Sequence, residues 1–115
     1  MLVVHLAHIF EEVWGRFWLM QALYGLGWFL IINWILFCIP VAILYFLLQG
    51  RRWVYYFGIV YAGIMIINGV GHNVATIMTG RYFDGFAGGY TGIALVLVGI
   101  PMIYFLRKER MDSRI

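Results

Sequence analysis

The chain begins with an apolar segment that carries two histidines and two glutamates close together. His5, His8 and Glu12 are spaced by three and four residues, so they lie on one face of a helix. Glu11 lies at the edge of that face. Ionisable side chains inside a membrane segment cost about 2.5–3.5 kcal/mol each on insertion scales, so the spacing predicts a functional site. A structural alternative is an i,i+4 ion pair between Glu12 and Arg16, with Glu11 facing headgroup water.

A second polar face occurs in a later apolar segment. Its members recur at i, i+4, i+8 and i+11, which is one side of a helix, and they are Asn68, His72, Thr76 and Thr79. If the two segments run in the same direction, Glu12 and His72 each lie about 12 Å from the outer ends of their helices. The two polar faces are therefore expected to meet at one depth.

Imidazole nitrogens and carboxylate oxygens together suit zinc. The sequence predicts that His8, Glu12 and His72 bind one divalent metal, with zinc as the favoured ion. His5 is an optional fourth ligand. Glu11 is predicted to act as the catalytic base, although it is also considered as the fourth ligand.

Two further polar residues are predicted to support this site. Asn68, one turn before His72, is a candidate catalytic residue that orients this histidine or polarises a substrate carbonyl. Thr76 is a candidate supporting hydrogen-bond partner.

Other chemistries remain open at this stage. A haem held by His8 and His72 fits poorly beside two carboxylates, and three histidines are too few for the di-iron cluster of a membrane hydroxylase. A metal-free isomerase could use glutamate and histidine as acid and base, because burial moves the pKa of a glutamate toward neutrality. A non-catalytic binding or transport component, or an interaction subunit, could use the same cluster.

Composition places the protein in a membrane. The chain has 115 residues, of which 64% are hydrophobic and 11% charged, and a mean hydropathy of +0.90. Its basic residues flank apolar stretches, which indicates membrane topology and no nucleic-acid partner. The N-terminal segment lacks a basic region, so no cleaved signal peptide is expected. Cys38 is the only cysteine, so no intrachain disulfide is expected.

The apolar segments predict an all-α, polytopic membrane protein that forms a single transmembrane domain over residues 1–115. Four transmembrane helices are expected at about 1–20, 22–49, 53–79 and 86–106, followed by a basic cytoplasmic tail at 107–115. Gly15 either lies within the first helix or breaks it into half a span. Gly88, Gly92 and Gly99 are expected to allow close packing of the last helix.

Basic residues also predict the orientation. With four spans, six lysines and arginines fall on one side of the membrane and two on the other, so both termini are expected in the cytoplasm. The expected partners are the lipid bilayer and an apolar or lipid-like substrate. Because so few helices enclose little interior, a homo-oligomer or a partner membrane subunit is expected as well.

The motifs also resemble those of a known family. His8-x-x-Glu11-Glu12, followed by Asn68-x-x-x-His72 and then Arg81-Tyr82, is similar to the HXXEE family of small bacterial integral membrane proteins. The resemblance covers most of the chain, although Asp84-Gly85 stands where that family has a proline-glycine turn. It implies a bacterial inner-membrane location and a candidate enzymatic site at the histidines, glutamates and asparagine of these motifs, without naming a substrate.

Overall fold

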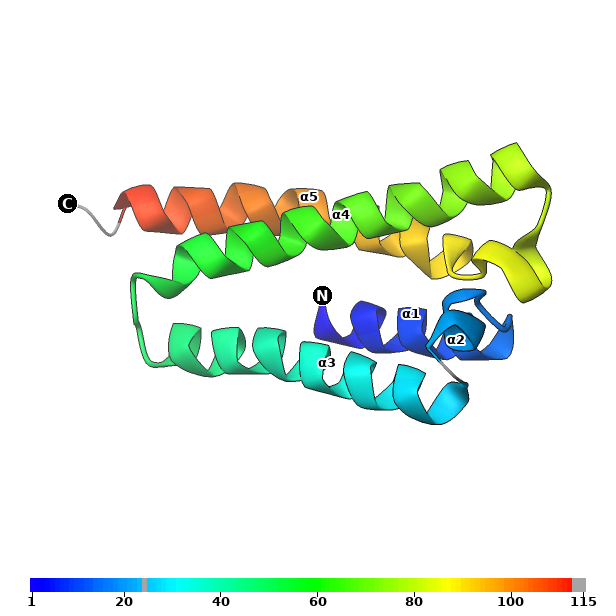
Figure 1. The fold of residues 1–115 in the computed structure, drawn as a ribbon. Helices are drawn as coiled ribbons and strands as arrows, with labels where there is room; N and C mark the ends of the chain where they lie inside the picture. Colours follow the sequence, from blue (N-terminus) through cyan, green and yellow to red (C-terminus); the bar gives the residue numbers. More distant parts are fainter. Residues whose placement is uncertain (24, 113–115) are drawn as a thin grey trace.

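The computed structural model describes residues 1–23 and 25–112, and the regular structure in this range is helical throughout. Its elements, in chain order, are α1 (Leu2–Trp14), α2 (Leu19–Ala22), α3 (Leu26–Leu48), α4 (Val54–Thr79), the short π-helical turn η1 (Tyr82–Phe86) and α5 (Gly89–Asp112) (Figure 1). The predicted all-α class is therefore confirmed.

Within the described range, three helices, α3, α4 and α5, are long and apolar enough to cross a membrane. The fourth expected span is not confirmed. Helix α1 has 13 residues, which is about 20 Å at 1.5 Å per residue against a hydrocarbon core of about 30 Å. It ends at Trp14 with Gly15 as its C-cap, and Arg16 follows with a positive φ of 55°. The first apolar segment is therefore interrupted at Gly15, as the half-span alternative predicts.

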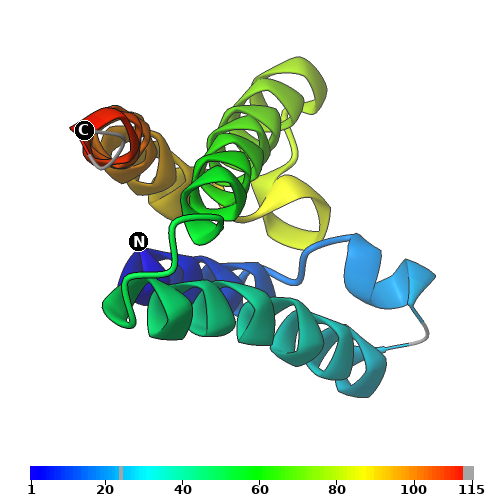
Figure 2. The same cartoon turned by 90° about the vertical axis from the view of Figure 1, so that its left-hand side faces the viewer.

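Helix α1 lies beside only part of the long helices. Figure 1 shows the N-terminus near the middle of their length, with α1 running in the same direction as α4 and opposite to α3 and α5. Met1 packs against the cluster of Ile43, Val54 and Tyr61. Figure 2 shows α4 and α5 crossing on one side of the molecule and α1 lying with α3 on the other. The polar face of the short α1 therefore lies inside the half of the bundle that ends at the loops after α1 and α4.

Two glycines allow α4 and α5 to approach closely. A Cβ atom at Gly69 would lie 2.3 Å from the carbonyl oxygen of Gly92, and one at Gly92 would lie 2.8 Å from that of Gly69. A Cβ at Gly99 would lie 2.7 Å from the side chain of Ile66. The predicted close packing at Gly92 and Gly99 is confirmed, whereas Gly88 precedes α5 and has a different role.

The loops after α1 and α4 are joined at one end of the bundle. The Trp18 N–H donates to Gly85 O at 2.9 Å, and the Asp84 N–H donates to Gly15 O at 2.9 Å. Arg16 forms an ion pair with Asp84 at 2.7 Å. The structural alternative, an ion pair between Glu12 and Arg16, is therefore wrong: Arg16 pairs with Asp84 and joins two loops, and Glu12 contacts His8 and His72.

The last helix differs from its predicted bounds at both ends. It begins at Gly89 because the preceding residues form η1, where Asp84 has a φ of 56°. It continues to Asp112, so residues 107–112 of the predicted tail are helical. Lysine, arginine and glutamate are good helix formers, and basic side chains near a helix C-terminus interact favourably with its dipole. Residues 113–115 of the predicted tail lie outside the described residues.

Candidate metal site

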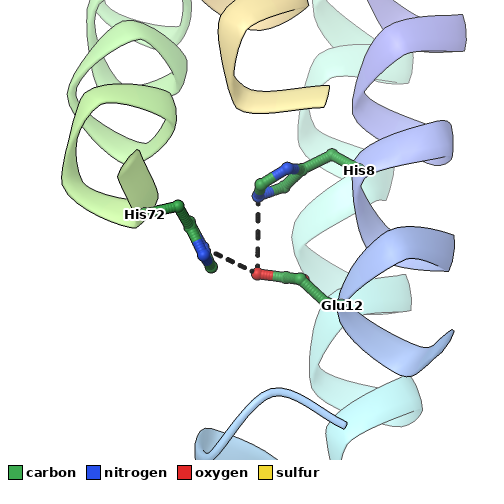
Figure 3. Close-up of side chains that lie close together, drawn as sticks. All are labelled: His8, Glu12 and His72. Carbon is green, nitrogen blue, oxygen red and sulfur yellow. Dashed lines mark ion pairs between the residues drawn. The ribbon is translucent and has the colours of Figure 1, made fainter. Parts of the chain in front are cut away.

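Three of the predicted metal ligands converge in the structure (Figure 3). Glu12 Oε1 lies 3.1 Å from His72 Nε2 and 3.4 Å from His8 Nε2. The three side chains, which we call the His–Glu–His cluster, are buried, with exposed fractions of 1% for His8 and 5% for Glu12 and His72. The expected match in depth between α1 and α4 is confirmed by this contact.

The other ring nitrogen of His72 fixes how this histidine faces the cluster. His72 Nδ1 lies 3.0 Å from Phe86 O, which also accepts a hydrogen bond from the Thr76 hydroxyl at 3.4 Å. A carbonyl oxygen only accepts, so Nδ1 must carry the proton. In the neutral ring, the lone pair of Nε2 therefore points at Glu12.

His8 has the same arrangement, with a hydroxyl in place of the carbonyl. Its Nδ1 lies 2.9 Å from Thr91 Oγ1, and the Thr91 hydroxyl donates to the carboxylate of Glu11. Because the hydroxyl proton is used in that bond, its oxygen accepts from His8 Nδ1–H. The lone pair of His8 Nε2 is then left facing the cluster.

With both rings neutral, two nitrogen lone pairs and one carboxylate oxygen thus meet in a buried place, and a proton, a hydrogen-bond donor or a metal ion between them would stabilise this arrangement. Metal-bound histidines usually donate their second N–H to an oxygen acceptor, as both do here. Tetrahedral zinc with ligands at about 2.0–2.1 Å places them about 3.3 Å apart. The two spacings to Glu12 Oε1, 3.1 and 3.4 Å, are close to this value, and all three ligand atoms lie within 4.8 Å of one another, so the residues present fit zinc.

Asn68 contacts the cluster as well. Its Nδ2 lies 3.0 Å from His8 Nε2. The amide therefore faces the position where an ion or a substrate oxygen would sit, and either its oxygen or its nitrogen can be presented there by rotation of the amide group. The structure brings this predicted residue to the site.

Glu11 occupies a different position from the other predicted residues. Its carboxylate accepts hydrogen bonds from Tyr82 Oη at 2.6 Å, from the backbone N–H groups of Tyr90 at 2.9 Å and Thr91 at 2.8 Å, and from the Thr91 hydroxyl. The backbone donors belong to the first turn of α5, where N–H groups lack helical partners. Glu11 therefore caps α5 from a separate helix, and donors occupy the lone pairs that a catalytic base would use.

The contact with Glu11 affects the pKa of Tyr82. Its burial, together with its hydrogen bond to the negatively charged Glu11 carboxylate, raises the pKa of the phenol above the ordinary value of 10.0. The neutral phenol is thus the form that fits the site.

His5 lies outside the cluster. Its Nδ1 is 2.8 Å from the Tyr61 hydroxyl, and its ring meets Phe37 edge-on at 5.3 Å between centroids. The group of three metal-binding side chains found among the described residues does not include it. His5, the optional fourth ligand, therefore makes a separate buried contact with Tyr61.

Gly88 forms one wall of the cluster. A Cβ atom there would lie 2.7 Å from His72 Nδ1 and 2.8 Å from His8 Cε1, and its φ is +130°. Only glycine allows the backbone to pass this close to both rings. The roles of Gly88, Thr91 and the Phe86 carbonyl were not predicted, because they depend on how the backbone enters α5 and leave no distinctive residue spacing.

A groove of about 610 Å³ adjoins the cluster. His8, Glu12 and Asn68 line one part of it, and His5 and Tyr61 line another. Apolar side chains form most of the remaining wall, among them Phe29, Leu36 and Ile43 from α3 and Phe57, Val60 and Ile64 from α4. The polar cluster is therefore reached through an apolar passage.

Comparison with known proteins gives no assignment. No protein-family model matches the chain, and neither a curated protein nor a solved structure matches it. What can be said of its function therefore rests on the geometry of this site.

Proposed function

We propose that this protein is a membrane-embedded, metal-dependent enzyme of the hydrolase type, with an apolar or lipid-like substrate. In this proposal His8, Glu12 and His72 bind one divalent ion, and zinc fits the donor set best. One observation carries the proposal: both histidines donate Nδ1–H to an oxygen acceptor, which leaves both Nε2 atoms facing the same buried carboxylate oxygen. Metal-binding histidines typically have this arrangement.

The bound ion would act as a Lewis acid toward an oxygen of the substrate or of water. The protein contributes the remaining functions through its own side chains. Asn68 faces the cluster from α4 and can hydrogen-bond the oxygen on which charge develops. The apolar groove keeps bulk water away and holds the rest of the substrate.

We propose that Glu11 is a positioning residue, in place of the catalytic base expected from the sequence. Its carboxylate holds the Thr91 hydroxyl, which in turn holds His8 Nδ1. This chain fixes the orientation of the ring and makes its Nε2 a better ligand. Glu11→Gln separates the two roles: a positioning residue would lose zinc affinity and thermal stability, whereas a base would keep both and lose only turnover.

The proposed location is the inner membrane of a bacterium, as the resemblance to the HXXEE family implies. Three apolar helices are compatible with an integral membrane protein. The segment between α3 and α4, which contains Arg51 and Arg52, lies at the end of the bundle where α5 ends (Figure 1), so we propose that this end is cytoplasmic. Association with a second copy or a partner subunit is also proposed, because a half-span and three spans enclose little interior.

A metal-free enzyme is the second candidate, and the contacts of Glu12 favour it specifically. Glu12 and His72 lie at hydrogen-bond distance, and Asn68 can donate to the His8 lone pair. A proton shared between Glu12 and His72 would then stabilise the cluster, and the pair would act as acid and base in an isomerase. A binding or transport component that uses the same cluster is the non-catalytic alternative.

Elemental analysis tests the proposal. Protein purified in detergent with zinc present, then passed through a desalting column, should retain about one zinc per chain. His8→Gln, Glu12→Gln and His72→Gln should each lose it, while His5→Gln, which alters a buried histidine on the same helix face, should keep it. Circular dichroism would verify that each variant is folded.

Each alternative predicts a different result. If the wild-type protein retains no metal, the metalloenzyme proposal fails and the acid-base isomerase becomes the favoured function. Stoichiometric zinc in a protein that cleaves no single-chain ester, amide or phosphoester in nanodiscs would favour binding or transport. Zinc retained by all three cluster variants would place the ion elsewhere and overturn the proposed site.

A further inference from the structure

The groove beside the cluster runs along two membrane-spanning helices and is open to the outside of the bundle. Its lining side chains Leu36, Phe57 and Val60 are 51%, 54% and 60% exposed. Because these positions lie in helices that are long and apolar enough to cross a membrane, they would face lipid chains in a bilayer. A molecule can therefore enter the groove sideways from the bilayer.

The polar groups of the groove are not evenly distributed. Glu12, His8 and Asn68 lie toward the end of the bundle that holds the joined loops, and the His5–Tyr61 contact lies one turn further along. Beyond these, toward the Arg51–Arg52 end, the lining is apolar and reaches Ile43 on α3 and Phe57 on α4. Phe17, Leu19 and Leu23, from the chain after α1, add a shorter apolar section, so the polar part of the groove lies between this section and the longer one that reaches Ile43 and Phe57.

Its length and volume match one hydrocarbon chain. From Asn68 to Phe57 along α4 the distance is about 16 Å, and from Phe29 to Ile43 along α3 it is about 21 Å, at 1.5 Å per residue. An extended chain covers about 1.2 Å per bond, since a residue of three bonds spans about 3.3–3.6 Å. The groove therefore accommodates roughly 13–18 bonds. Its volume of about 610 Å³ corresponds to about 20 groups of some 30 Å³, the liquid volume of one water molecule.

The charge at the His–Glu–His cluster determines which head group of such a molecule is attracted. Two neutral imidazoles and one carboxylate around a divalent ion leave a net positive centre. An oxygen-bearing group such as an ester, carboxylate or phosphate would therefore be attracted, and an ammonium group would be repelled.

We propose that the groove binds a single-chain lipid from the bilayer. Its oxygen-bearing head would lie at the His–Glu–His cluster, and its chain would extend between α3 and α4 toward Ile43 and Phe57. This inference rests on the proposed function, because it names the substrate class of the same site. It also commits to one chain in the groove, since about 610 Å³ matches a single hydrocarbon chain of this length.

Photo-crosslinking in nanodiscs tests this inference. The probe is a 16-carbon carboxylic acid with a diazirine near its methyl end, and a second probe has the diazirine near the carboxyl group. The first should label residues around Ile43 and Phe57, and the second residues around Asn33 and Asn68, as read by peptide mass spectrometry. An 18-carbon alkyl ammonium carrying the same diazirine should label the groove at least fivefold less.

Two tryptophan substitutions narrow the groove, and each has a matched control on the same helix. Leu36→Trp and Val60→Trp should lower groove labelling at least fivefold. Val41→Trp on α3 and Val74→Trp on α4 alter exposed positions that do not line the groove, and they should leave the labelling unchanged. All four positions are partly exposed, so none of the substitutions disrupts the buried core.

Labelling that spreads evenly over lipid-facing residues, or that Leu36→Trp and Val60→Trp leave unchanged, would overturn the inference. Zinc content measured on the same samples separates the two proposals. Zinc without groove labelling would contradict only the lipid site. Groove labelling without zinc would contradict the metalloenzyme and the role of the ion in attracting the head, and would leave the groove as the binding site of the chain.

Discussion

Thr91 connects the candidate metal site to the rest of the molecule. Its hydroxyl receives the Nδ1–H of His8 and donates its own proton to Glu11. The hydroxyl thereby fixes which nitrogen of His8 is protonated, and so which nitrogen can bind a metal. A threonine outside the cluster thus controls the orientation of a proposed metal ligand.

Removal of this hydroxyl should weaken metal binding. Thr91→Val keeps the shape of the side chain but leaves His8 Nδ1 without its acceptor, so zinc affinity should fall about 10–100-fold, the usual effect of losing such a partner. Thr91→Ser should restore it. Competition with a chromophoric chelator measures the affinity.

The control is Thr79→Val, which removes a hydroxyl whose partners, Ala75 O and the Arg81 N–H, lie outside the cluster, so zinc affinity should not change. If Thr91→Val binds zinc as tightly as the wild type, Thr91 and Glu11 do not position the ligand.

Gly88 gives a second prediction at the level of single residues. Gly88→Ala would place a methyl group within 2.8 Å of both histidine rings at a φ of +130°, so the rings must move apart. Zinc stoichiometry and the melting temperature should both fall.

Gly71→Ala is the matched control, because its added methyl group meets open space on α4. The control should be neutral or stabilising by up to about 1 kcal/mol. Full zinc occupancy in Gly88→Ala would contradict this prediction, because the two rings would then accommodate the methyl group without losing the ion.

At the level of elements, the half-span α1 and the start of α5 are held together by hydrogen bonds. Glu11 of α1 accepts the first-turn N–H groups of α5, and Tyr82 of η1 donates to the same carboxylate. These bonds carry charge on the acceptor, which makes them stronger than bonds between neutral groups. The capped start of α5 in turn carries Thr91 to His8.

The pKa of Tyr82 gives this contact a measurable pH dependence. Because the pKa is raised in the folded state, the contribution of Tyr82 to stability is fully present below its ordinary value of 10.0 and is lost as the pH rises through the raised value. Wild-type protein should melt at a higher temperature than Tyr82→Phe at pH 8. This difference should shrink above pH 10. A difference that stays constant from pH 8 to pH 12 would show that the neutral phenol does not stabilise the fold.

Much of this arrangement could be predicted from the sequence, because it depends on spacing. The i,i+4 pair of His8 and Glu12, and the polar face that contains Asn68 and His72, both follow from helical periodicity. The half-span was left open because Gly15 and Arg16 permit either a bend or a continuous helix. The role of Glu11 could not be predicted, since its partners are backbone N–H groups whose position depends on the turn at Asp84 and Gly85.

At the level of the whole molecule, the joined loops and the basic residues lie at opposite ends. Arg16 and Asp84 pair at one end, while Arg51, Arg52 and the end of α5 lie at the other. The excess of basic residues at the second end predicts that it faces the cytoplasm. The N-terminus, expected there as well, instead lies near the middle of the long helices in Figure 1, beside the core cluster that contains Tyr61.

Cysteine labelling tests this orientation. In a Cys38→Ser background, Gln49→Cys and Asp112→Cys should resist an impermeant thiol reagent in intact cells, whereas Arg81→Cys should react. All three positions are exposed in the structure. Reaction at positions 49 and 112 with protection at 81 would reverse the proposed orientation while leaving the metal site unaffected.

The central claim is that two histidines and one glutamate from α1 and α4 hold a zinc ion. X-ray absorption at the zinc edge tests it most directly, because imidazole rings give a distinctive outer-shell scattering pattern. The expected spectrum contains two imidazole nitrogens and carboxylate oxygen at about 2.0–2.2 Å, and His72→Gln should lose one imidazole contribution or the bound zinc. A wild-type spectrum without imidazole scattering, or a spectrum that His72→Gln leaves unchanged, would contradict the account.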